Sequence, residues 1–436
     1  MVKRKRKQCV RKSIFDKPAL TSFVDANGWK ARHVKTFYAV VRKQATLLTK
    51  VSDFERNVLE ELSKEKSFPK DMIEKIFVSF QIFSTTMVKS YISKDGTVKM
   101  LVQTHDDHKV ECVVIPHLNR STCCVSSQIG CAMGCKFCAT GTMGILGDLH
   151  YSEILEQLMY AKIFNENRGR LNVVFMGMGE PLRNYENVRD TVLGMIDRDL
   201  FGMARRHITV STVGVIENIK RLTKDLPGVS LALSLHAATQ EKRESIVLSA
   251  KAYPLEKLMN AMDNHFRACE LYLGKRKFAQ TRMMIEYVLL KNVNDQEEDA
   301  ESLKRLLGHR PAIGLNLIPY NPNVTAKLYG YEAPSVEEAQ KFREMCRNRG
   351  LFVTLRIEHG QDIAAACGQL ALSSDIEDAG GKTKNKKKKV MVTKRRTNNN
   401  TGTSKNHILV KGAAAFFFIL SLVFLALYFL QTSSPL

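Results

Sequence analysis

The sequence predicts an α/β fold built around a mainly parallel sheet. From Cys124 onward, apolar runs of strand length alternate with amphipathic helical runs, which is typical of a parallel sheet covered by helices. Polar and glycine-containing motifs follow several of these strands, where the loops of such folds carry ligands. The predicted strands are residues 173–178, 207–213, 229–235, 282–290, 314–318 and 351–357. The predicted helices are residues 152–164, 186–197, 215–224, 255–269, 296–307 and 335–347.

The region before this alternation predicts a small accessory domain. Residues 13–95 are mostly helical in pattern, and Ser52-Asp-Phe-Glu55 reads as a capping box that opens one helix. Residues 97–104 and 109–116 alternate in strand fashion and predict a hairpin. Farther along, Ser335-Val-Glu-Glu338 is a second capping box, at the start of the last helix.

The charge of the chain is strongly positive and unevenly distributed. The 436 residues are 44% hydrophobic, enough for a large core, and carry a net charge of +22. Residues 382–411 hold eleven Lys and Arg without an acidic residue, and residues 1–12 hold seven more, which leaves +4 for the rest. Such basic runs either are solvated tails or attract a polyanion such as RNA.

Cysteine usage predicts a reducing compartment. Ten cysteines occur in a long chain with no secretory signal, whereas disulfide frameworks belong to small secreted domains. The basic residues 1–12 are followed by no apolar signal region, so we expect a cytoplasmic catalytic body.

The other end of the chain predicts a membrane anchor. Residues 412–430 are apolar except for Ser421, long enough to cross a hydrocarbon layer about 30 Å thick. A basic, disordered linker, residues 373–411, precedes them. We expect a transmembrane tail anchor whose basic flank lies on the cytosolic side.

Three closely spaced cysteines predict an iron-sulfur cluster. Cys131, Cys135 and Cys138 form a C-x3-C-x2-C motif. Three thiolates on one loop can hold three irons of a cubane and leave the fourth iron without a protein ligand. Structural zinc is the alternative, but zinc prefers two C-x2-C pairs or paired histidines, and the sequence has no second pair. The spacing is that of the radical S-adenosylmethionine enzymes.

Five motifs narrow this resemblance to the RlmN/Cfr family of RNA adenine methyltransferases, over residues 13–372. In chain order they are Cys124-Val-Ser-Ser-Gln-Ile-Gly-Cys131, Met176-Gly-Met-Gly-Glu-Pro181, Ser234-Leu-His-Ala237, Leu317-Ile-Pro-Tyr-Asn321 and Asp362-Ile-Ala-Ala-Ala-Cys-Gly-Gln-Leu370. Two residues depart from the family pattern. His359 stands where bacterial members usually carry arginine, and Cys123 offers a second thiol beside Cys124.

The resemblance implies a fold and a set of cofactors. Residues 96–372 would form a partial (β/α)6 barrel that binds a [4Fe-4S] cluster and S-adenosylmethionine. Taken one by one, the polar residues at the strand ends are helix caps or satisfied polar groups as readily as ligands. By resemblance, the S-adenosylmethionine pocket is lined by Gly179, Glu180, Ser211, Ser234, Leu235, His236 and Asn321.

The resemblance also implies an unusual reaction. Carbon 2 of adenine is not nucleophilic, so a radical route is needed to methylate it. Cys367 would take a methyl group from one S-adenosylmethionine, and a 5′-deoxyadenosyl radical made from a second would activate that methyl group to attack the base. Glu111 would act as the proton acceptor, and Cys124 would release the product by forming a transient disulfide with Cys367.

The expected partner is RNA, as tRNA next to the anticodon, large-subunit rRNA, or both, because an unpaired loop adenosine can be unstacked into a buried site. We also expect an electron donor of the flavodoxin or ferredoxin type, contact with a membrane through the C-terminal tail, and a monomeric state. Three alternatives stay open: a carbon-8 methyltransferase of the Cfr type, a membrane-tethered RNA-binding protein without activity, and an iron-sulfur redox sensor.

Overall fold

The structure is a computed structural model, and it describes residues 6–7, 9–47, 50–165, 169–274, 283–310 and 312–371. All of these belong to one compact unit, Met1–Gly381. The second unit, Lys382–Leu436, lies outside the described residues, and so do the predicted linker and tail.

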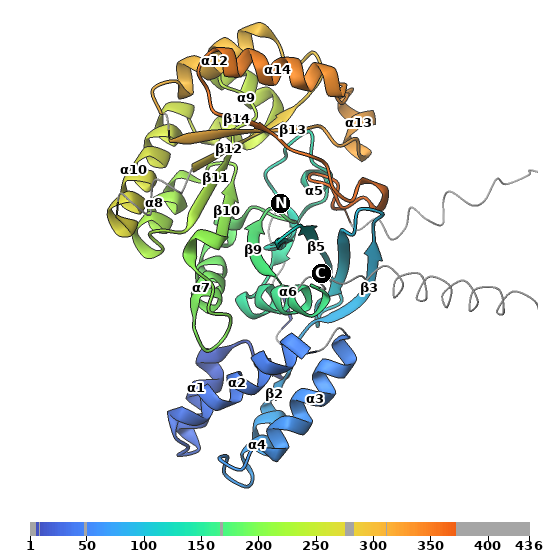
Figure 1. The fold of residues 1–436 in the computed structure, drawn as a ribbon, viewed down its shortest axis with the longest axis vertical. Helices are drawn as coiled ribbons and strands as arrows, with labels where there is room; N and C mark the ends of the chain where they lie inside the picture. The colour runs from blue at the N-terminus through green and yellow to red at the C-terminus, as the bar shows by residue number, and fades with distance from the viewer. Residues whose placement is uncertain are drawn as a thin grey trace, which may run out of the picture. The chain divides into compact units, whose positions relative to one another are not determined.

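A ten-stranded sheet forms the body of this unit, in the order β14-β13-β12-β11-β10-β9-β6-β5-β4-β3 (Figure 1). Within the described residues, seven neighbouring strands are parallel and three at one edge are antiparallel. The parallel strands are β6 (Arg120–Cys124), β9 (Arg170–Phe175), β10 (Ile208–Thr212), β11 (Ser230–Ser234), β12 (Met283–Leu289), β13 (Ile313–Pro319) and β14 (Val353–Leu355). The sheet does not close on itself, because β14 and β3 are both edges.

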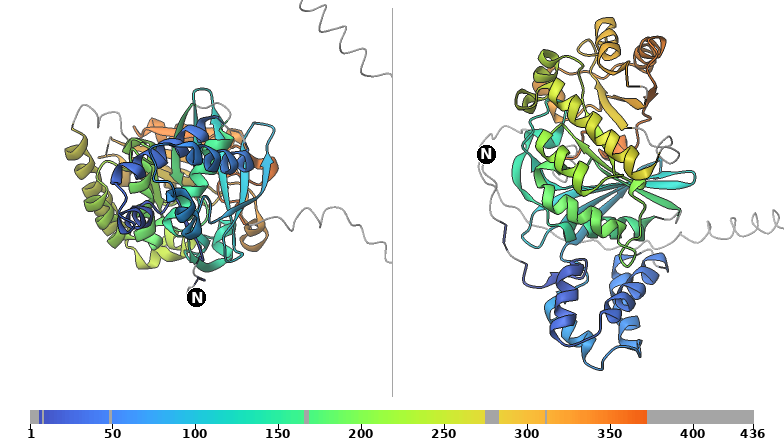
Figure 2. Two further views of the ribbon diagram at one scale, coloured as in Figure 1. Left: turned by 90° about the horizontal axis from the view of Figure 1, so that it is seen from below. Right: turned by 90° about the vertical axis from the view of Figure 1, so that its left-hand side faces the viewer.

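Helices cross between the parallel strands and pack on one side of the sheet (Figures 1 and 2). A crossover connection between parallel strands is right-handed, which directs successive helices to the same face. Every predicted strand and helix of this region is present, within a few residues at each end. The crossover helices are α6 (Tyr151–Phe164), α7 (Tyr185–Ile196), α8 (Ile216–Asp225), α10 (Leu255–Leu273), α12 (Glu297–Leu307) and α14 (Val336–Asn348).

Local sequence explains individual helices. α8 buries Ile216, Ile219 and Leu222, three residues at helical spacing, and exposes its charged face. The predicted capping box of α14 is confirmed: the Ser335 side chain accepts from the Glu338 N–H, and the Glu338 side chain accepts from the Ser335 N–H.

The antiparallel edge contains the predicted hairpin, formed by β4 (Val98–Gln103) and β5 (Lys109–His117). β5 continues the sheet into β6, a short strand that the sequence patterns did not reveal. β3 (Thr86–Ile92) pairs with β4, although it falls inside the predicted accessory domain. The cysteine loop is therefore joined to the sheet through β6.

The N-terminal region is helical, as its pattern predicted. It contains α1 (Lys17–Ala26), α2 (Ala31–Leu47), α3 (Val51–Lys64) and α4 (Met72–Ser79). The capping box predicted at Ser52 is wrong: the N-cap of α3 is Lys50, two residues before Ser52, and no side chain caps the helix. Ser52 lies inside the first turn, where its side chain cannot cap the helix.

One residue of the basic N-terminal segment is anchored to the body of the protein. The Arg6 guanidinium lies 2.5 Å from an Asp106 carboxylate oxygen and 2.6 Å from a Glu153 carboxylate oxygen. All three side chains are at most 13% exposed. This part of the basic segment is therefore not a freely solvated tail.

The predicted location of the protein has to be corrected. Within the described ranges, no helix is long and apolar enough to span a bilayer. Residues 412–430, on which the anchor was predicted, lie outside those ranges. An apolar run satisfies the length requirement for a span, but length alone does not place a helix in a membrane. The prediction of a tail-anchored chain is therefore withdrawn.

Candidate active site

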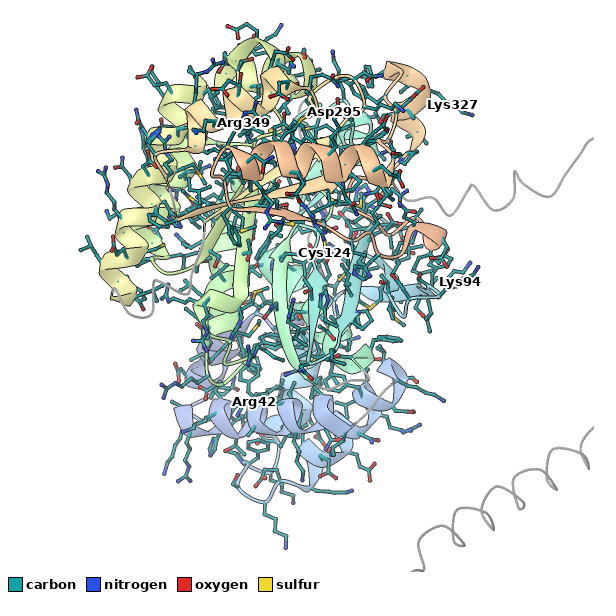
Figure 3. All side chains as sticks on the ribbon, turned by 45° about the horizontal axis from the view of Figure 1, so that its top comes forward. Arg42, Lys94, Cys124, Asp295, Lys327 and Arg349 are labelled. Carbon is teal, nitrogen blue, oxygen red and sulfur yellow. The ribbon has the colours of Figure 1, made fainter. Side chains whose placement is uncertain are left out.

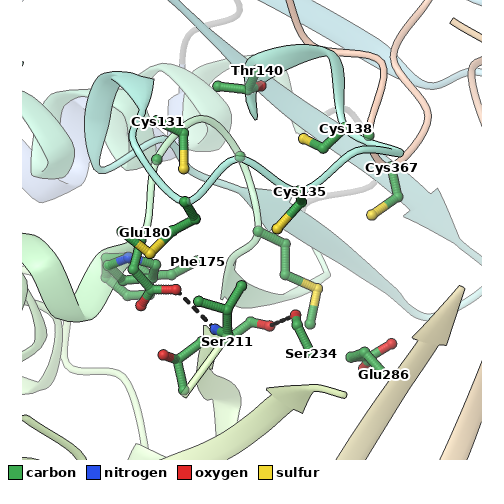
Figure 4. A pocket seen from close by; sticks show the side chains of 18 of the residues that line it. Cys131, Cys135, Cys138, Thr140, Phe175, Glu180, Ser211, Ser234, Glu286 and Cys367 are labelled. Carbon is green, nitrogen blue, oxygen red and sulfur yellow. Dashed lines mark hydrogen bonds between the residues drawn. The ribbon is translucent and has the colours of Figure 1, made fainter. Parts of the chain in front are cut away.

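The three clustered cysteines lie on the chain that runs from the last residue of β7 (Gln128–Cys131) to β8 (Gly144–Asp148), and backbone contacts with Ile246 and Val247 hold this loop in place. β7 pairs with β8, and the loop between them ends in the short helix α5 (Ala139–Thr142). The middle of the loop is pinned by a bridge between Cys135 and Val247 and by a 3.0 Å bond from the Lys136 N–H to the Ile246 carbonyl. Figure 4 shows the thiols of this loop facing one cavity.

The environment of these thiols is largely apolar. Burial raises the pKa of all three thiols, to about 12 for Cys131. A metal that binds here has to displace their protons. Within the described ranges, no three His, Cys, Asp or Glu side chains are grouped tightly enough to hold a single metal ion. A single zinc ion would need all of its thiolates at about 2.3 Å, and no such grouping is found in these ranges.

A buried arginine beside the loop supports an anionic group at this place. Arg243 is fully buried, and it donates from Nε to the Leu235 carbonyl and from Nη2 to the Val213 carbonyl. Its Nη1 has no hydrogen-bond partner. An unpaired buried cationic donor is costly. A cluster ligated by three thiolates carries net negative charge, so the residues present fit the cluster.

The cavity in front of the thiols opens to solvent. About 800 Å³ of space free of atoms lies within it and at its open mouth. Residues at or near the carboxyl ends of β9, β10, β11 and β13 line it, together with Glu286 from the middle of β12. Of the predicted pocket residues, the cavity brings together Gly179, Glu180, Ser211, Ser234 and His236.

Glu180 is the most constrained of these residues. Its carboxylate accepts bonds of 2.9 Å from the Val213 and Leu182 N–H groups, one on each oxygen. Burial raises its pKa to about 7, against the lowering effect of those hydrogen bonds. The carboxyl can therefore still accept a bond from an ammonium or hydroxyl group of a ligand.

Strand alternation divides the Ser234-Leu-His motif between the cavity and the core. The Ser234 hydroxyl lies 3.4 Å from that of Ser211, and both line the cavity. His236 accepts a 3.0 Å bond on Nδ1 from the Val288 N–H, and burial lowers its pKa to about 3, so the ring is neutral. Leu235 is fully buried in the core and does not line the cavity. Successive strand residues face opposite sides, so only the Leu235 backbone is left for a ligand.

The glycines of the Met176-Gly-Met-Gly-Glu motif have a structural cause. Gly179 has φ +97°, and a Cβ there would lie 2.4 Å from the Gln128 Cβ. A Cβ at Gly177 would lie 2.7 Å from the Val125 carbonyl oxygen. The chain itself approaches these glycines, so close approach of a ligand is not needed to explain them.

A second cavity adjoins the first and contains the two predicted redox thiols. Cys124 and Cys367 both line it, and Cys367 also lines the first cavity. Cys124 lies at the end of β6, near the segment that follows β14 (Figure 3). Burial raises the pKa of both thiols, and the positive charge of Arg356, in the same cavity, opposes this rise. Cys367 thus connects the cofactor cavity to the second cavity.

The segment carrying Cys367 is held against the cysteine loop. The Ala139 N–H donates a 2.8 Å bond to the Gly368 carbonyl, and the Thr140 hydroxyl donates a 2.5 Å bond to the Leu370 carbonyl. Asn321 donates from its amide to the Cys367 carbonyl at 3.1 Å. Asn321 lines the second cavity and not the first, so in this structure it orders the Cys367 segment.

Glu111 lies beside these cavities but lines neither of them. It belongs to β5, on the same face as Val113 and Ile115, which do line the second cavity. Its side chain is buried, and Lys99 Nζ lies 3.3 Å from its Oε1.

Sequence reasoning missed three polar residues of this region. Glu286 is buried and lines the first cavity, Arg356 lines the second, and Lys99 pairs with Glu111. Glu286 falls inside a predicted strand and Arg356 close to the end of another. An ionisable residue in an otherwise apolar strand was the available signal.

Comparison with known proteins places this chain among related enzymes. Residues 125–303 match the model of the radical SAM superfamily. The chain is 42% identical over 304 residues to the dual-specificity RNA methyltransferase RlmN of Zymomonas mobilis, covering 68% of this chain and 74% of that protein. It is 39% identical to the probable dual-specificity RNA methyltransferase RlmN of Dictyoglomus turgidum, covering 72% of this chain and 85% of that protein. Among solved structures, a radical SAM methyltransferase from Sphaerobacter thermophilus superposes with a TM-score of 0.72 at 33% identity, covering 82% of this chain and 99% of that one.

Proposed function

This chain belongs to the RlmN family of radical SAM RNA methyltransferases, and on that premise we propose that it methylates carbon 2 of an adenosine through Cys367 and Cys124. It is an S-adenosylmethionine-dependent RNA methyltransferase with a [4Fe-4S] cluster. Cys131, Cys135 and Cys138 would hold the cluster. When bound, the cluster supplies the electron that cleaves S-adenosylmethionine and so starts the radical chemistry.

The observation that carries the proposal is the position of Cys367. It lines both the cavity with the cluster thiols and the cavity with Cys124. A residue that receives a methyl group at one place and delivers it to a base at another has to be accessible from both. Cys367 is an exposed residue, although enough protein surrounds its thiol to raise the pKa of that thiol. Its carbonyl accepts a bond from Asn321, and the residues after it are hydrogen-bonded to the cysteine loop.

The roles of the remaining residues follow from their surroundings. Glu180, Ser211 and Ser234 would orient S-adenosylmethionine by accepting or donating hydrogen bonds in the first cavity, and His236 would donate from Nε2. The Leu235 carbonyl would complete this set. The Asn321 amide is bonded to the Cys367 carbonyl and to Gln361, so Asn321 would act on the cofactor only through the Cys367 segment. A 5′-deoxyadenosyl radical would remove one hydrogen atom from the methyl group on Cys367, and the remaining CH2 carbon would bond to the base, leaving RNA and protein cross-linked through that carbon.

Release of the methylated base would need a proton acceptor and a second sulfur. Glu111 would accept the proton that the base has to lose. Cys124 would attack the Cys367 sulfur, so that a disulfide forms as the sulfur–carbon bond breaks. The electron pair of that bond would stay with the product, whose bridging carbon takes up a proton and becomes the methyl group. Arg356 lowers the pKa of both thiols relative to burial alone, which favours the thiolate that this attack requires.

The substrate proposed is an unpaired adenosine of tRNA next to the anticodon, of large-subunit rRNA, or of both. The relatives are named dual-specificity RNA methyltransferases. A loop adenosine costs less to unstack than a paired one, and the target atom has to reach Cys367 inside a cavity. An electron carrier of the flavodoxin or ferredoxin type would reduce the cluster.

Mass spectrometry of RNA tests this proposal directly. Total tRNA and rRNA from cells lacking the gene would be digested to nucleosides and compared with RNA from cells carrying the wild-type gene or Cys367→Ala. We expect 2-methyladenosine to disappear in the deletion and to return only with the wild-type gene. If 8-methyladenosine depends on the gene instead, the enzyme methylates carbon 8. If neither nucleoside changes, the proposal is contradicted.

A further inference from the structure

Lys99 and Glu111 form a buried ion pair that the reaction scheme has not used. They lie on the neighbouring strands β4 and β5, and Lys99 Nζ is 3.3 Å from Glu111 Oε1. The two side chains are 5% and 3% exposed. Removing two charges from water costs free energy that their attraction often fails to repay, so a buried ion pair is weak evidence for a role in stability.

The same ammonium group reaches the segment that carries Cys367. Lys99 Nζ lies 3.4 Å from the Ala364 carbonyl oxygen, three residues before Cys367 in the chain. Ala364 has φ +49°, a left-handed conformation that is unusual for a residue other than glycine. The Tyr91 ring covers the ammonium, with its centroid 5.2 Å away. One side chain therefore contacts both the proposed proton acceptor and the segment of the methyl-carrying thiol.

We propose that Lys99 is a positioning residue, which holds the Glu111 carboxylate at a set place relative to Cys367 for the proton transfer that precedes product release. The inference rests on the proposed role of Glu111. In that step the proton moves from the cross-linked base to a Glu111 oxygen, and the electron pair of the broken bond stays in the base. Lys99 itself neither gains nor loses a proton.

Other contacts hold the Cys367 segment without Lys99. The Ser93 hydroxyl donates a 2.5 Å bond to the Asp362 carboxylate, and the Gly360 N–H donates a 3.1 Å bond to the Asp95 carboxylate. A Lys99 variant therefore keeps this segment anchored to the β3–β4 turn. The substitution should displace the Glu111 carboxylate and leave the position of the Cys367 segment unchanged.

Single-turnover kinetics tests the inference. Cluster-loaded protein already methylated on Cys367 would be mixed with RNA, S-adenosylmethionine and a reductant, and 5′-deoxyadenosine, covalent protein–RNA adduct and methylated RNA would be followed in time. For Lys99→Met we expect 5′-deoxyadenosine and adduct to form at the wild-type rate and the adduct to decay ~10- to 100-fold more slowly. Lys99→Arg, which keeps the charge and the reach, should restore most of the decay rate.

Two further variants separate the possible explanations. Lys89 is an exposed lysine whose ammonium also lies over the Tyr91 ring, at 4.4 Å, so Lys89→Met is a matched control that should leave decay unchanged. Wild-type adduct decay in Lys99→Met, or an equal slowing of 5′-deoxyadenosine formation and decay, would overturn the inference. Glu111→Gln tests the proposed function separately: if it releases product at the wild-type rate, Glu111 is not the proton acceptor, whatever Lys99 does.

Discussion

The sulfur atoms of Cys112 and Cys123 lie 3.8 Å apart in the core, between β5 and β6. Both residues are fully buried. Because neighbouring residues of a strand face opposite sides, this contact turns Cys124 toward the cavity that contains Cys367. This contact agrees with the sequence-based choice of Cys124, made on its seven-residue spacing to Cys131, over the adjacent thiol of Cys123.

The first prediction follows from this separation. Cys124→Ala should form the cross-link to RNA but lack the sulfur that releases it, so a covalent protein–RNA adduct should accumulate and turnover should fall by at least ~100-fold. Denaturing gel electrophoresis with labelled RNA measures the adduct. Cys123→Ala is the matched control and should turn over normally. Adduct in the Cys123 variant with normal turnover in the Cys124 variant would show that the wrong thiol was chosen.

The second prediction concerns the cluster. Protein reconstituted without oxygen should hold about four irons per chain. Alanine at Cys131, Cys135 or Cys138 should lower the iron content sharply, because each thiolate holds a separate iron. Iron and acid-labile sulfide analysis measures this, with Cys9→Ala as a control for a thiol far from the loop in sequence. Full iron content in all three variants would contradict the assignment of the ligands.

The third prediction concerns Glu180 and pH. Burial raises the pKa of this carboxyl to about 7, so it is largely protonated below that pH and ionised above it. Only the ionised form accepts a bond from an ammonium group on both oxygens, so S-adenosylmethionine should bind more tightly as the pH rises through about 7. Calorimetric titration at pH values on either side of that pKa measures the affinity. Glu180→Gln should bind about tenfold more weakly at the upper end, as expected for the loss of a charged hydrogen bond.

The Glu180→Gln variant also serves as the control for the ligand, since any titration of the ligand's own amino group persists in it. If wild type and Glu180→Gln share the same pH dependence, Glu180 does not contact the cofactor as an ionised group.

The fourth prediction concerns Arg356. Burial raises the pKa of Cys124 and of Cys367, and the charge of Arg356 lowers both. Arg356→Met should therefore raise both pKa values further and reduce the thiolate fraction at neutral pH. We expect adduct release to slow and its pH profile to move to higher pH, while Arg356→Lys stays close to wild type. Release rates measured from neutral to mildly alkaline pH check this, and an unchanged profile would exclude a role for this charge.

The sequence by itself determined most of the secondary-structure elements after Cys124 and the cofactors of this protein. Strands and helices after Cys124 follow from apolar periodicity, which depends on neighbouring residues only, and the Ser335 capping box was correct for the same reason. The cysteine motif identified the cofactor, because its spacing reflects the ligands that one short loop can offer. The Ser52 capping box was wrong because the same four-residue pattern also fits inside a helix that starts earlier.

Tertiary structure decided which of those residues meet. Asn321 binds the Cys367 segment, and Lys99 pairs with Glu111 on the neighbouring antiparallel strand. Lys99 also reaches Ala364, 265 residues along the chain, because the fold places β4 beside the segment that follows β14. Leu235 matches the family motif as well as Ser234 does, yet it lies in the core, because strand alternation assigns it to the other face. Such contacts depend on pairing and register, which are set by packing across the whole sheet and leave no trace in any short stretch of sequence.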